Sequence, residues 1–410
     1  MNGGPAKPAA WLPFSIAEAS FSEGAHPDDL DVAQGWEHLL DRLTAAADLV
    51  TGSPFARNRL DHAAGLRHLL VLAAMGIDEA LRFDPDPILG ISRTSTDDVL
   101  TWGMDCPDAI YTRAMLRGGL TYRLFGNRGT ARYVGLQTMN GIVATANALV
   151  DELEVDPEGN FEVIISADER EGNWMRIDGD NPTLVVRHFF YDWNTEVPSS
   201  LRIERIGTGS ECGRQTIDQD VVVSRQLVAL GEFVYANLKF FHDWGGTPPA
   251  NGFLAPIDLS SVGGAAENRP VIGRWELQPD EALILEVKPP NGVYWSYSLG
   301  NPWWETIHYG RHQSSLNAHQ AVVDSDGLLR TVVCSHDPGV ANWLDTAGYS
   351  NGAMILRCVR TDTAPMPTTR VVKVDEIPSA LPGETKTVTA QERAAIIAAR
   401  RRAVHARFAR

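Results

Sequence analysis

Short strand-like runs, separated by turns, are the feature that most constrains the fold of this chain. Five runs come first, at residues 120–125, 131–138, 161–166, 184–190 and 201–206, with Gly, Asn and Asp between them. Parallel strands need long crossover connections, so this spacing favours antiparallel, meander-like pairing. Strand-like runs resume at 283–288, 293–299, 321–324, 328–335 and 354–359, after a Gly-, Pro- and Ser-rich linker at 245–265. The sequence therefore predicts two β-rich units.

Helical patterns lie before, between and after these runs. One apolar stripe contains Trp36, Leu39, Leu40, Leu43, Ala47 and Val50, and a second contains Leu66, Leu69, Leu70, Ala74, Ile77 and Leu81. Both stripes follow the helical period, and Ser53-Pro54 provides an N-cap and a proline for the start of the second helix. A third helix is expected at about 222–241. A fourth follows Thr389, which forms a capping box with Glu392.

These patterns predict an α+β fold whose β-rich part consists of antiparallel sandwich or jelly-roll-like sheets. An N-terminal segment with a helical unit is expected at 1–88, and a first β-rich unit with a long helix at 89–245. A second β-rich unit is expected at 266–375, and a basic C-terminal helix at 376–410. That helix carries six Arg against one Glu from residue 392 onward, so we expect it to dock on its own acidic protein or on a second copy.

Charge and segment composition exclude several classes of protein. The net charge of −16 argues against nucleic-acid binding, which requires a basic footprint. The chain holds no uninterrupted apolar run of transmembrane length, and its first residues lack the features of a signal peptide. We therefore expect a cytoplasmic protein with no membrane partner, which acts on a small molecule and can assemble as a homo-oligomer.

No cofactor or metal is expected. The glycine-rich nucleotide motifs, the hydrolase nucleophile motif and the zinc-protease motif are absent from the sequence. The four cysteines form no C-x-x-C pair, and the spacing of His308 and His312 supports a metal site only weakly because Gly310 makes a helix there doubtful. Cys106 is the one cysteine considered for reactivity, and its acidic neighbours should raise its pKa.

The densest cluster of chemically active residues is HFFYDWNTE at 188–196. Tyr191 and Trp193 flank Asp192, and Glu196 falls in the same turn. A carboxyl group desolvated by aromatic rings can act as a general acid near neutral pH. The alternative is that Asp192 accepts backbone N–H groups in the turn while the aromatic rings fill a core.

A second cluster at 301–320 combines aromatic walls with polar groups. Trp304 and Tyr309 supply flat surfaces, while His308, Arg311 and Asn317 supply donors and an acid/base group. His308 is the candidate base because an unperturbed imidazole titrates near neutral pH. The alternative is a surface loop anchored by tryptophans.

Two further segments complete the candidate site. The loop at 336–348 contains Asn342 and Trp343 and is expected to support the rim of the site. The segment 105–114 places Asp108, Tyr111 and Arg113 at the entry to the first strand region, where Tyr111 is a candidate substrate contact.

The segments CPDAIYTRA, GNWMRI, HFFYDWNTEVP, SSLNAHQAVVDSDG and HDPGVANWLDTAG resemble those of the bacterial domain of unknown function 1214 family. The resemblance runs from about residue 97 to residue 358. It implies a mixed architecture dominated by sandwich or jelly-roll-like sheets, and it assigns no catalytic residues. Family members usually carry Asn where this chain has Cys106.

The residues themselves favour an acid/base enzyme without a cofactor, acting on a small, partly apolar alcohol, ether or carbonyl compound. Such a lyase, hydratase, dehydratase or isomerase would use Asp192 or Glu196 as the acid and His308 as the base. Tyr191, Arg311 and Asn342 would orient the substrate. Two alternatives remain open: a non-catalytic protein that binds a carbohydrate or lipophilic ligand, and an assembly subunit.

Overall fold

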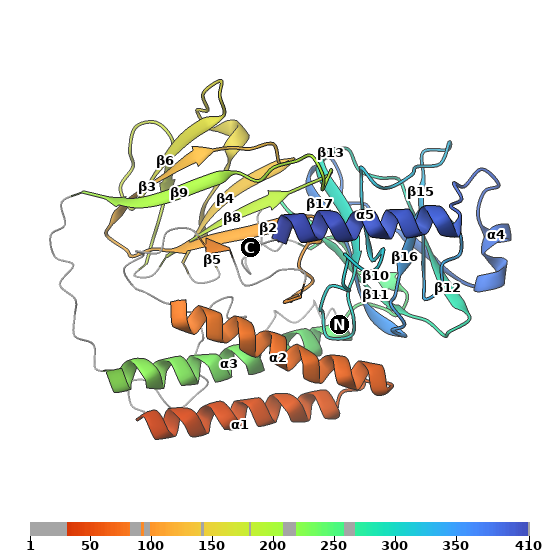
Figure 1. The fold of residues 1–410 in the computed structure, drawn as a ribbon, viewed down its shortest axis with the longest axis horizontal. Helices are drawn as coiled ribbons and strands as arrows, with labels where there is room; N and C mark the ends of the chain where they lie inside the picture. The colour runs from red at the N-terminus through yellow and green to blue at the C-terminus, as the bar shows by residue number, and fades with distance from the viewer. Residues whose placement is uncertain are drawn as a thin grey trace, which may run out of the picture.

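The computed structural model describes residues 31–82, 92–93, 99–140, 143–179, 182–207, 219–257 and 267–408. Three parts named above lie outside these residues: the lead-in segment before residue 31, residues 258–265 of the linker, and Cys212. The α+β fold expected from the sequence is confirmed: β-rich units stand above a layer of helices, and a C-terminal helix crosses the β-rich part (Figure 1).

The first β-rich unit is a sandwich of two sheets. One sheet has the order β1 (Ser92–Arg93), β2 (Ala109–Met115), β8 (Thr183–Phe189), β4 (Tyr133–Asn140) and β5 (Val143–Leu149). The other has the order β7 (Trp174–Arg176), β6 (Asn160–Ser166), β3 (Thr121–Asn127) and β9 (Ser200–Ile206). Alternate residues such as Leu184 and Val186 of β8 meet Leu124 and Val163 in a single apolar core.

The second β-rich unit repeats this arrangement. Its first sheet has the order β10 (Gly252–Phe253), β11 (Val271–Glu276), β17 (Asn351–Thr361), β13 (Gly292–Leu299) and β14 (Ser315–Asn317). Its second sheet has the order β16 (Trp343–Asp345), β15 (Leu329–Cys334), β12 (Glu281–Val287) and β18 (Thr368–Lys373). Trp275, Leu283, Val333 and Leu356 share the core between the sheets. Within the described strands, β6–β7 and β15–β16 pair parallel, whereas the other pairs are antiparallel.

The strand expected at 321–324 does not form. Asn342 takes the place of a neighbouring strand here: its Oδ1 accepts the Val322 N–H at 2.9 Å, and its Nδ2 donates to the Val322 carbonyl at 2.6 Å. The same amide donates to the Arg330 carbonyl at 3.0 Å. One side chain thus satisfies the backbone of an irregular segment, which an apolar run alone cannot reveal.

Three helices form the layer beneath the sandwiches: α1 (Val32–Thr51), α2 (Arg59–Arg82) and α3 (Gln219–Gly245). The long helix α3, which the sequence grouped with the first β-rich unit, packs against α1 and α2. Glycines permit the close approach, because a Cβ at Gly76 would lie 2.6 Å from Leu230 Cδ1 and one at Gly35 would lie 2.9 Å from Ser224 Oγ. The helical unit is therefore built from two separate parts of the chain.

The sequence predicted the wrong apolar face and the wrong first residue for α2. Leu70 and Leu81 are 71% and 75% exposed, whereas Leu72 and His68 are fully buried on another face. The small residues Gly65 and Gly76 let that other face pack closely, which outweighs the larger apolar stripe. The helix starts at Arg59, where Asn58 Oδ1 accepts the N–H groups of residues 60 and 61, and not at Ser53-Pro54.

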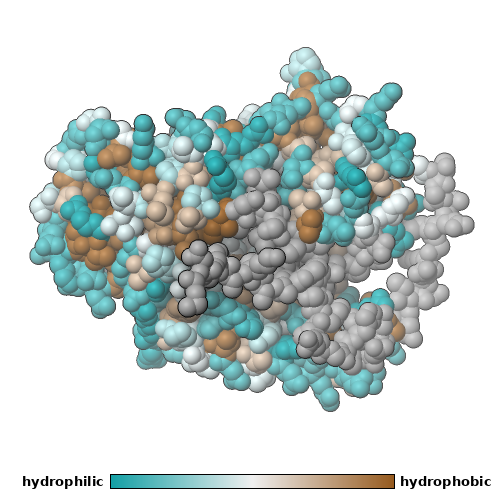
Figure 2. Space-filling view, turned by 180° about the vertical axis from the view of Figure 1, so that it is seen from behind, coloured by the Kyte–Doolittle hydropathy of each residue, from teal (hydrophilic) through white to brown (hydrophobic). Residues whose placement is uncertain are grey.

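Residues Arg59–Asp78 of α2 are long and apolar enough to cross a membrane by length and hydropathy, and 44% of that window is buried inside the protein. Helices packed in the core of folded domains often reach the same length and hydropathy. Elsewhere on the surface, the face in Figure 2 carries hydrophobic residues in small patches between hydrophilic ones.

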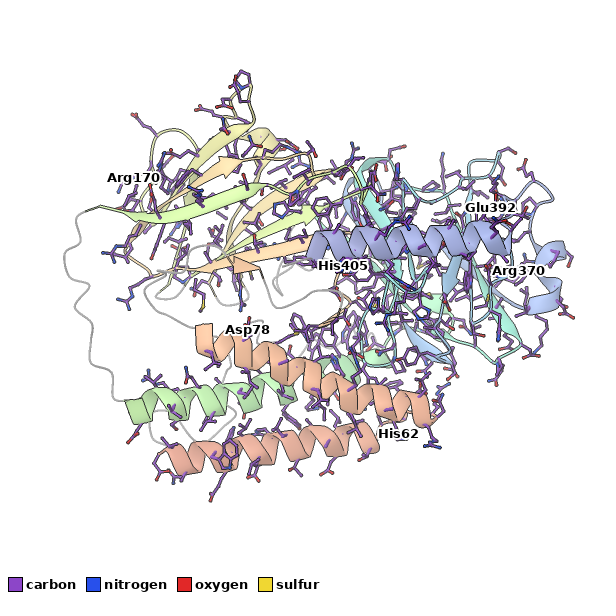
Figure 3. All side chains as sticks on the ribbon, in the orientation of Figure 1. His62, Asp78, Arg170, Arg370, Glu392 and His405 are labelled. Carbon is purple, nitrogen blue, oxygen red and sulfur yellow. The ribbon has the colours of Figure 1, made fainter. Side chains whose placement is uncertain are left out.

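The C-terminal helix α5 (Ala390–Phe408) follows the short helix α4 (Ile377–Ala380). Its predicted capping box is confirmed: Thr389 Oγ1 accepts the Glu392 N–H at 3.2 Å, and the Glu392 carboxylate accepts the Thr389 N–H at 2.7 Å. Glu392 and His405 mark the two ends of α5 along the β-rich part (Figure 3). The helix therefore lies across both sandwiches.

Candidate functional site

Polar side chains gather on the outer face of the β2-β8-β4 sheet, the face away from the apolar core. The strand register aligns Tyr111 of β2, Arg187 of β8 and Gly135 of β4 in one row. Tyr133 and Gln137 of β4 lie on the same face and are almost fully buried, at 2% and 1% exposure. A polar sheet face that is this deeply buried is unusual for a structural surface.

The missing side chain of Gly135 makes room on this face. A Cβ there would lie 2.2 Å from the Tyr133 hydroxyl, so only glycine lets the tyrosine ring lie across the sheet. The Tyr133 hydroxyl donates to Glu267 Oε2 at 2.8 Å, and Arg187 donates to Gln137 Oε1 at 2.5 Å. Burial, followed by the nearby Glu267 charge, raises the pKa of Tyr133, and burial lowers the pKa of Arg187.

A strained loop at 102–108 connects this face to the second β-rich unit. Met104 and Trp304 both have left-handed backbones, with φ of 55° and 62°, which are uncommon for residues other than glycine. They meet in one hydrogen bond, in which the Met104 N–H donates to the Trp304 carbonyl at 2.8 Å. Strained backbone held by neighbouring structure often occurs at functional sites.

Asp105 lies in this loop and carries the most strongly perturbed carboxyl group of the cluster. Its Oδ1 is buried and has no hydrogen-bond partner in the described part of the chain. Burial raises its pKa from 3.8 to about 7, against the opposing effects of the Thr306 hydroxyl and the Arg357 charge. A carboxyl group with this pKa can both release and accept a proton near neutral pH.

Arg357 of β17 approaches the same loop from the second β-rich unit. It is 7% exposed, donates to Ser298 Oγ at 2.8 Å, and donates to the Met104 carbonyl. The charge of Arg357 acts on the pKa values of Asp105, Cys106 and Tyr111. Its guanidinium group is thus at the centre of the cluster.

Tyr111 and Cys106 complete the cluster. Burial is the main cause of the raised pKa of Tyr111, and it also raises the pKa of Cys106, to which the Asp108 charge adds. The expectation of a raised thiol pKa is therefore confirmed. Cys106 Sγ lies 3.2 Å from the Tyr294 hydroxyl.

Asp108 is the fully buried junction between this cluster and the second unit. Its carboxylate accepts Trp193 Nε1–H at 2.6 Å, the Tyr294 hydroxyl at 2.6 Å and Asn317 Nδ2–H at 2.8 Å. Trp193 and Asn317, predicted as substrate contacts from distant segments, are thus brought together. Both side chains donate to a buried carboxylate that accepts three hydrogen bonds, so these contacts join the two β-rich units.

Helix α5 lies over this junction through arginines seven residues apart. The Arg393 guanidinium lies over the Trp343 ring, and its Nε donates to Asp337 at 3.0 Å. The Arg400 guanidinium lies 4.6 Å from the Trp193 ring centroid, and Arg407 lies 4.9 Å from the same ring. Burial lowers the pKa of Arg400 to about 10.

The two predicted acids instead hold their own turn together. Asp192 accepts the Asn194 N–H at 2.9 Å and the Thr195 hydroxyl at 2.7 Å, and these bonds lower its pKa. Glu196 accepts the N–H groups of Tyr191 and Asp192 at 3.0 and 3.3 Å. The expectation of a raised pKa for Asp192 is wrong, because hydrogen bonds to its charged form outweigh desolvation.

The other predicted residues lie in several places. The Tyr191 hydroxyl accepts the Trp295 N–H at 3.2 Å, which links the two units. His308 opens a turn whose carbonyl accepts the N–H groups of Arg311 and His312, and Arg311 is exposed on the surface. Tyr309 is buried, and its ring lies edge-on to Trp193 with centroids 6.0 Å apart.

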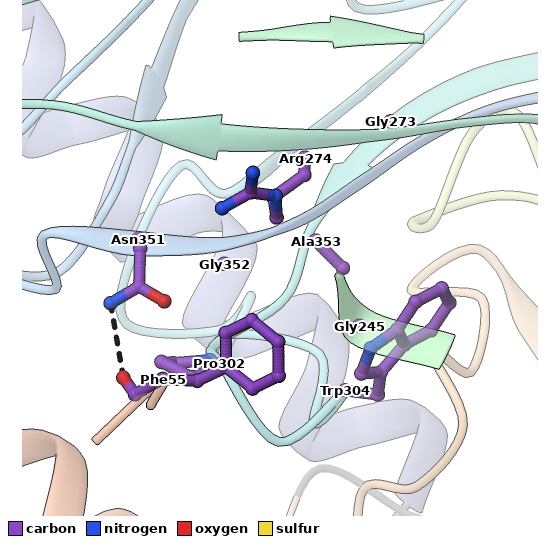
Figure 4. A pocket seen from close by; sticks show the side chains of 9 residues that line it. All are labelled: Phe55, Gly245, Gly273, Arg274, Pro302, Trp304, Asn351, Gly352 and Ala353. Atoms are coloured by element: carbon purple, nitrogen blue, oxygen red, sulfur yellow. Dashed lines mark hydrogen bonds between the residues drawn. The ribbon is translucent and has the colours of Figure 1, made fainter. Parts of the chain in front are cut away.

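Trp304, whose carbonyl accepts the Met104 N–H, borders a small hollow whose other lining residues are not part of the polar cluster (Figure 4). This hollow encloses about 250 Å³, including space open to solvent, and Phe55, Arg274, Pro302 and Asn351 also border it. An Asn351 amide donates to the Phe55 carbonyl at 3.3 Å across its floor. A ligand pocket needs more enclosed space than this, so the hollow is a weak candidate.

A second buried polar cluster lies where α2 meets the second unit. Glu305 is 3% exposed, and although burial opposes it, the nearby His68 and the Asn301 and Arg67 side chains lower its pKa. His68 Nδ1 lies 3.4 Å from Glu305 Oε1. Over the described ranges, no group of three or more His, Cys, Asp or Glu side chains converges as metal ligands would.

Sequence reasoning missed Asp105, Arg187, Arg357 and Tyr294 as site residues. They lie on three strands and one loop, and no local motif connects them. The sequence holds a signal for two of them. Arg187 and Arg357 each lie in a strand-like run, LVVRHFF and MILRCV, whose other residues are mostly apolar, as in a buried strand. Charges inside such runs are almost always paired or functional.

No family model matches the chain, and no curated protein matches it. Among solved structures, the chain is similar to an uncharacterised protein from Burkholderia cenocepacia, with 31% identity over 85% of this chain and 98% of that chain and a TM-score of 0.77. The VPA0106 protein from Vibrio parahaemolyticus shares 12% identity over 75% of this chain and 98% of that one, with a TM-score of 0.44. On the first of these similarities, the chain belongs to the family of the Burkholderia cenocepacia protein.

Proposed function

We propose that the protein is an enzyme that moves protons on a small organic compound, as a lyase, hydratase, dehydratase or isomerase. The buried Asp105 Oδ1, without a hydrogen-bond partner in the described ranges and close to Arg357 and Tyr111, carries this proposal. Asp105 replaces Asp192 as the proposed acid/base group. In an isomerisation, ionised Asp105 would take a proton from one atom of the substrate and return it to another, so the carboxyl group ends as it began.

The surroundings of Asp105 support access by a ligand. Asp105, Tyr111 and Arg187 each keep part of their surface accessible, yet burial is the largest influence on the pKa of all three. This combination describes side chains that protein atoms almost enclose and that keep a small accessible surface. Titratable groups with strongly shifted pKa values that cluster at such a place are candidates for catalysis. The resemblance to the domain of unknown function 1214 family is proposed alongside, and it assigns no reaction.

The test uses solvent deuterium, which reveals a substrate that has not been identified beforehand. Wild-type protein is incubated in D₂O with a mixture of small organic acids, alcohols and carbonyl compounds, and mass spectrometry identifies those that gain deuterium or change by one water. We expect Asp105→Asn to reduce the rate about 100-fold or more. Asp192→Asn is the matched control, because it makes the same substitution in a turn.

Retained exchange in Asp105→Asn would refute the assignment of Asp105. Loss in Asp192→Asn alone would restore the role expected from the sequence. A wild-type protein that alters none of the compounds would count against an enzyme.

An assembly subunit is the second candidate, because α2 exposes apolar side chains. Leu66, Leu70, Ile77 and Leu81 are 46%, 71%, 45% and 75% exposed. A helix face of this kind often lies in an interface between subunits. Light scattering after gel filtration should then show an oligomer that Leu70→Glu dissociates, and a wild-type monomer would exclude this candidate.

A further inference from the structure

We infer that the site proposed around Asp105 binds its substrate through a carboxylate group, held by Arg357 together with Arg187. This inference deepens the proposed function and rests on it for the location of the reacting atoms. It names the substrate class as small organic acids.

The first step of the argument is the charge of Arg357. Its two hydrogen bonds go to neutral oxygens, the Ser298 hydroxyl and the Met104 carbonyl. Within the described chain, no carboxylate forms an ion pair with it. The Asp105 charge acts on Arg357 without forming an ion pair with it, and a buried cation without a directly bonded counter-ion is costly, so a bound anion would offset that cost.

The second step is the position of Arg187. The register places it beside Tyr111, and the charges of both Arg187 and Arg357 act on the pKa of Tyr111. Tyr111 thus lies beside Arg187 on the sheet and within range of the Arg357 charge, and the two arginines come from different β-rich units. The Glu267 charge offsets part of the Arg187 charge, whereas Asp105, the carboxyl group near Arg357, is about half protonated at neutral pH because its pKa is about 7.

The third step selects a carboxylate over a phosphate. A guanidinium group is a planar fork that matches the two oxygens of a carboxylate. Phosphate sites commonly use backbone N–H groups at the start of a helix, whereas the groups here are side chains on β-strands and a loop. A carboxylate also carries a single charge, which the proposed acid/base group Asp105 would repel less than a phosphate dianion.

The experiment measures binding separately from turnover. Acetate, propionate and benzoate are titrated into the full-length protein at constant ionic strength, each beside its neutral amide and with inorganic phosphate as a further probe. Calorimetry gives the dissociation constants. We expect at least one carboxylate to bind more tightly than its amide and than phosphate, and Arg357→Lys to weaken that binding about tenfold.

Arg274→Lys is the matched control, because Arg274 is a partly buried arginine that borders the small hollow instead. Its binding should equal that of the wild type. If Arg357→Lys fails to fold, as judged by circular dichroism, Arg187→Lys replaces it and should weaken binding about fivefold. Equal binding of every acid and its amide would overturn the inference, and so would an effect confined to Arg274→Lys.

The outcomes also separate the inference from the proposed function. Deuterium exchange by the wild type without any carboxylate binding would remove the inference and leave the enzyme. Carboxylate binding through Arg357 without any exchange would keep the binding site and remove the proposed acid/base reaction.

Discussion

The Asp105→Asn variant should gain stability relative to the wild type as the pH rises. In the unfolded chain the carboxyl group loses its proton near pH 3.8, whereas in the folded protein burial raises the pKa to about 7. Between these values the folded state holds a proton that the unfolded state has lost. The free energy of unfolding of the wild type therefore falls as the pH rises from 4 to 7, and then levels off.

The size of the effect follows from the pKa difference. At 1.36 kcal/mol for each pH unit between 3.8 and about 7, ionisation of Asp105 costs about 4 kcal/mol. About 3 kcal/mol of this should develop between pH 5 and pH 8. Asn has nearly the same shape and no charge, so Asp105→Asn should lack this loss.

The assay is urea unfolding of both proteins at pH 5 and pH 8, followed by tryptophan fluorescence. Asp192→Asn is the control: the lowered pKa of Asp192 stabilises the fold everywhere above pH 4, so the variant should lose the same stability at pH 5 and at pH 8. If the difference between Asp105→Asn and the wild type is the same at both pH values, Asp105 titrates as an ordinary carboxyl group and the reasoning fails.

Three further predictions concern the neighbours of Asp105. Asp108→Leu should lower the free energy of unfolding by about 2–6 kcal/mol, because it leaves the buried donors of Trp193 and Tyr294 without an acceptor, while the Asn317 amide keeps the Tyr191 carbonyl. Asp108→Asn should cost about 1–2 kcal/mol, and equal urea midpoints for the two variants would contradict this. Gly135→Ala should cost about 1–3 kcal/mol, because its methyl group displaces Tyr133, and an unchanged melting temperature would show that the ring can move freely. The buried Cys106 thiol, with its raised pKa, should resist alkylation until urea unfolds the chain, as peptide mapping would show; rapid labelling of the native protein would refute its burial.

The sequence predicted the antiparallel sheets well because strand patterns are local. Runs such as 161–166 and 201–206 alternate along one strand, and the structure places β6 and β9 there. The strand predicted at 321–324 was wrong because the Asn342 side chain, distant in sequence, satisfies the backbone of this segment. The prediction of the buried face of α2 was wrong because close packing at Gly65 and Gly76 decides which side of the helix is buried.

The candidate site was harder to predict because it forms between the units. Asp105 and Arg357 come from a loop and a strand that are far apart in the chain, so their proximity depends on how the sandwiches meet. Sequence reasoning weighted local density instead, and therefore favoured Asp192 among its aromatic neighbours. A turn can explain such a cluster equally well, as the hydrogen bonds of Asp192 show.

The arginine spacing of α5 has a consequence for synthesis on the ribosome. The first sandwich is complete by residue 207, yet Arg400, which lies over Trp193, is added almost two hundred residues later. At typical translation speeds of about 5–20 residues per second, the two events are separated by roughly 10–40 seconds. The nascent first sandwich lacks the covering helix for the whole interval, and it also lacks the donors of Tyr294 and Asn317 for about the first half of it. We expect chaperones to bind this surface of the growing chain until the last helix is made.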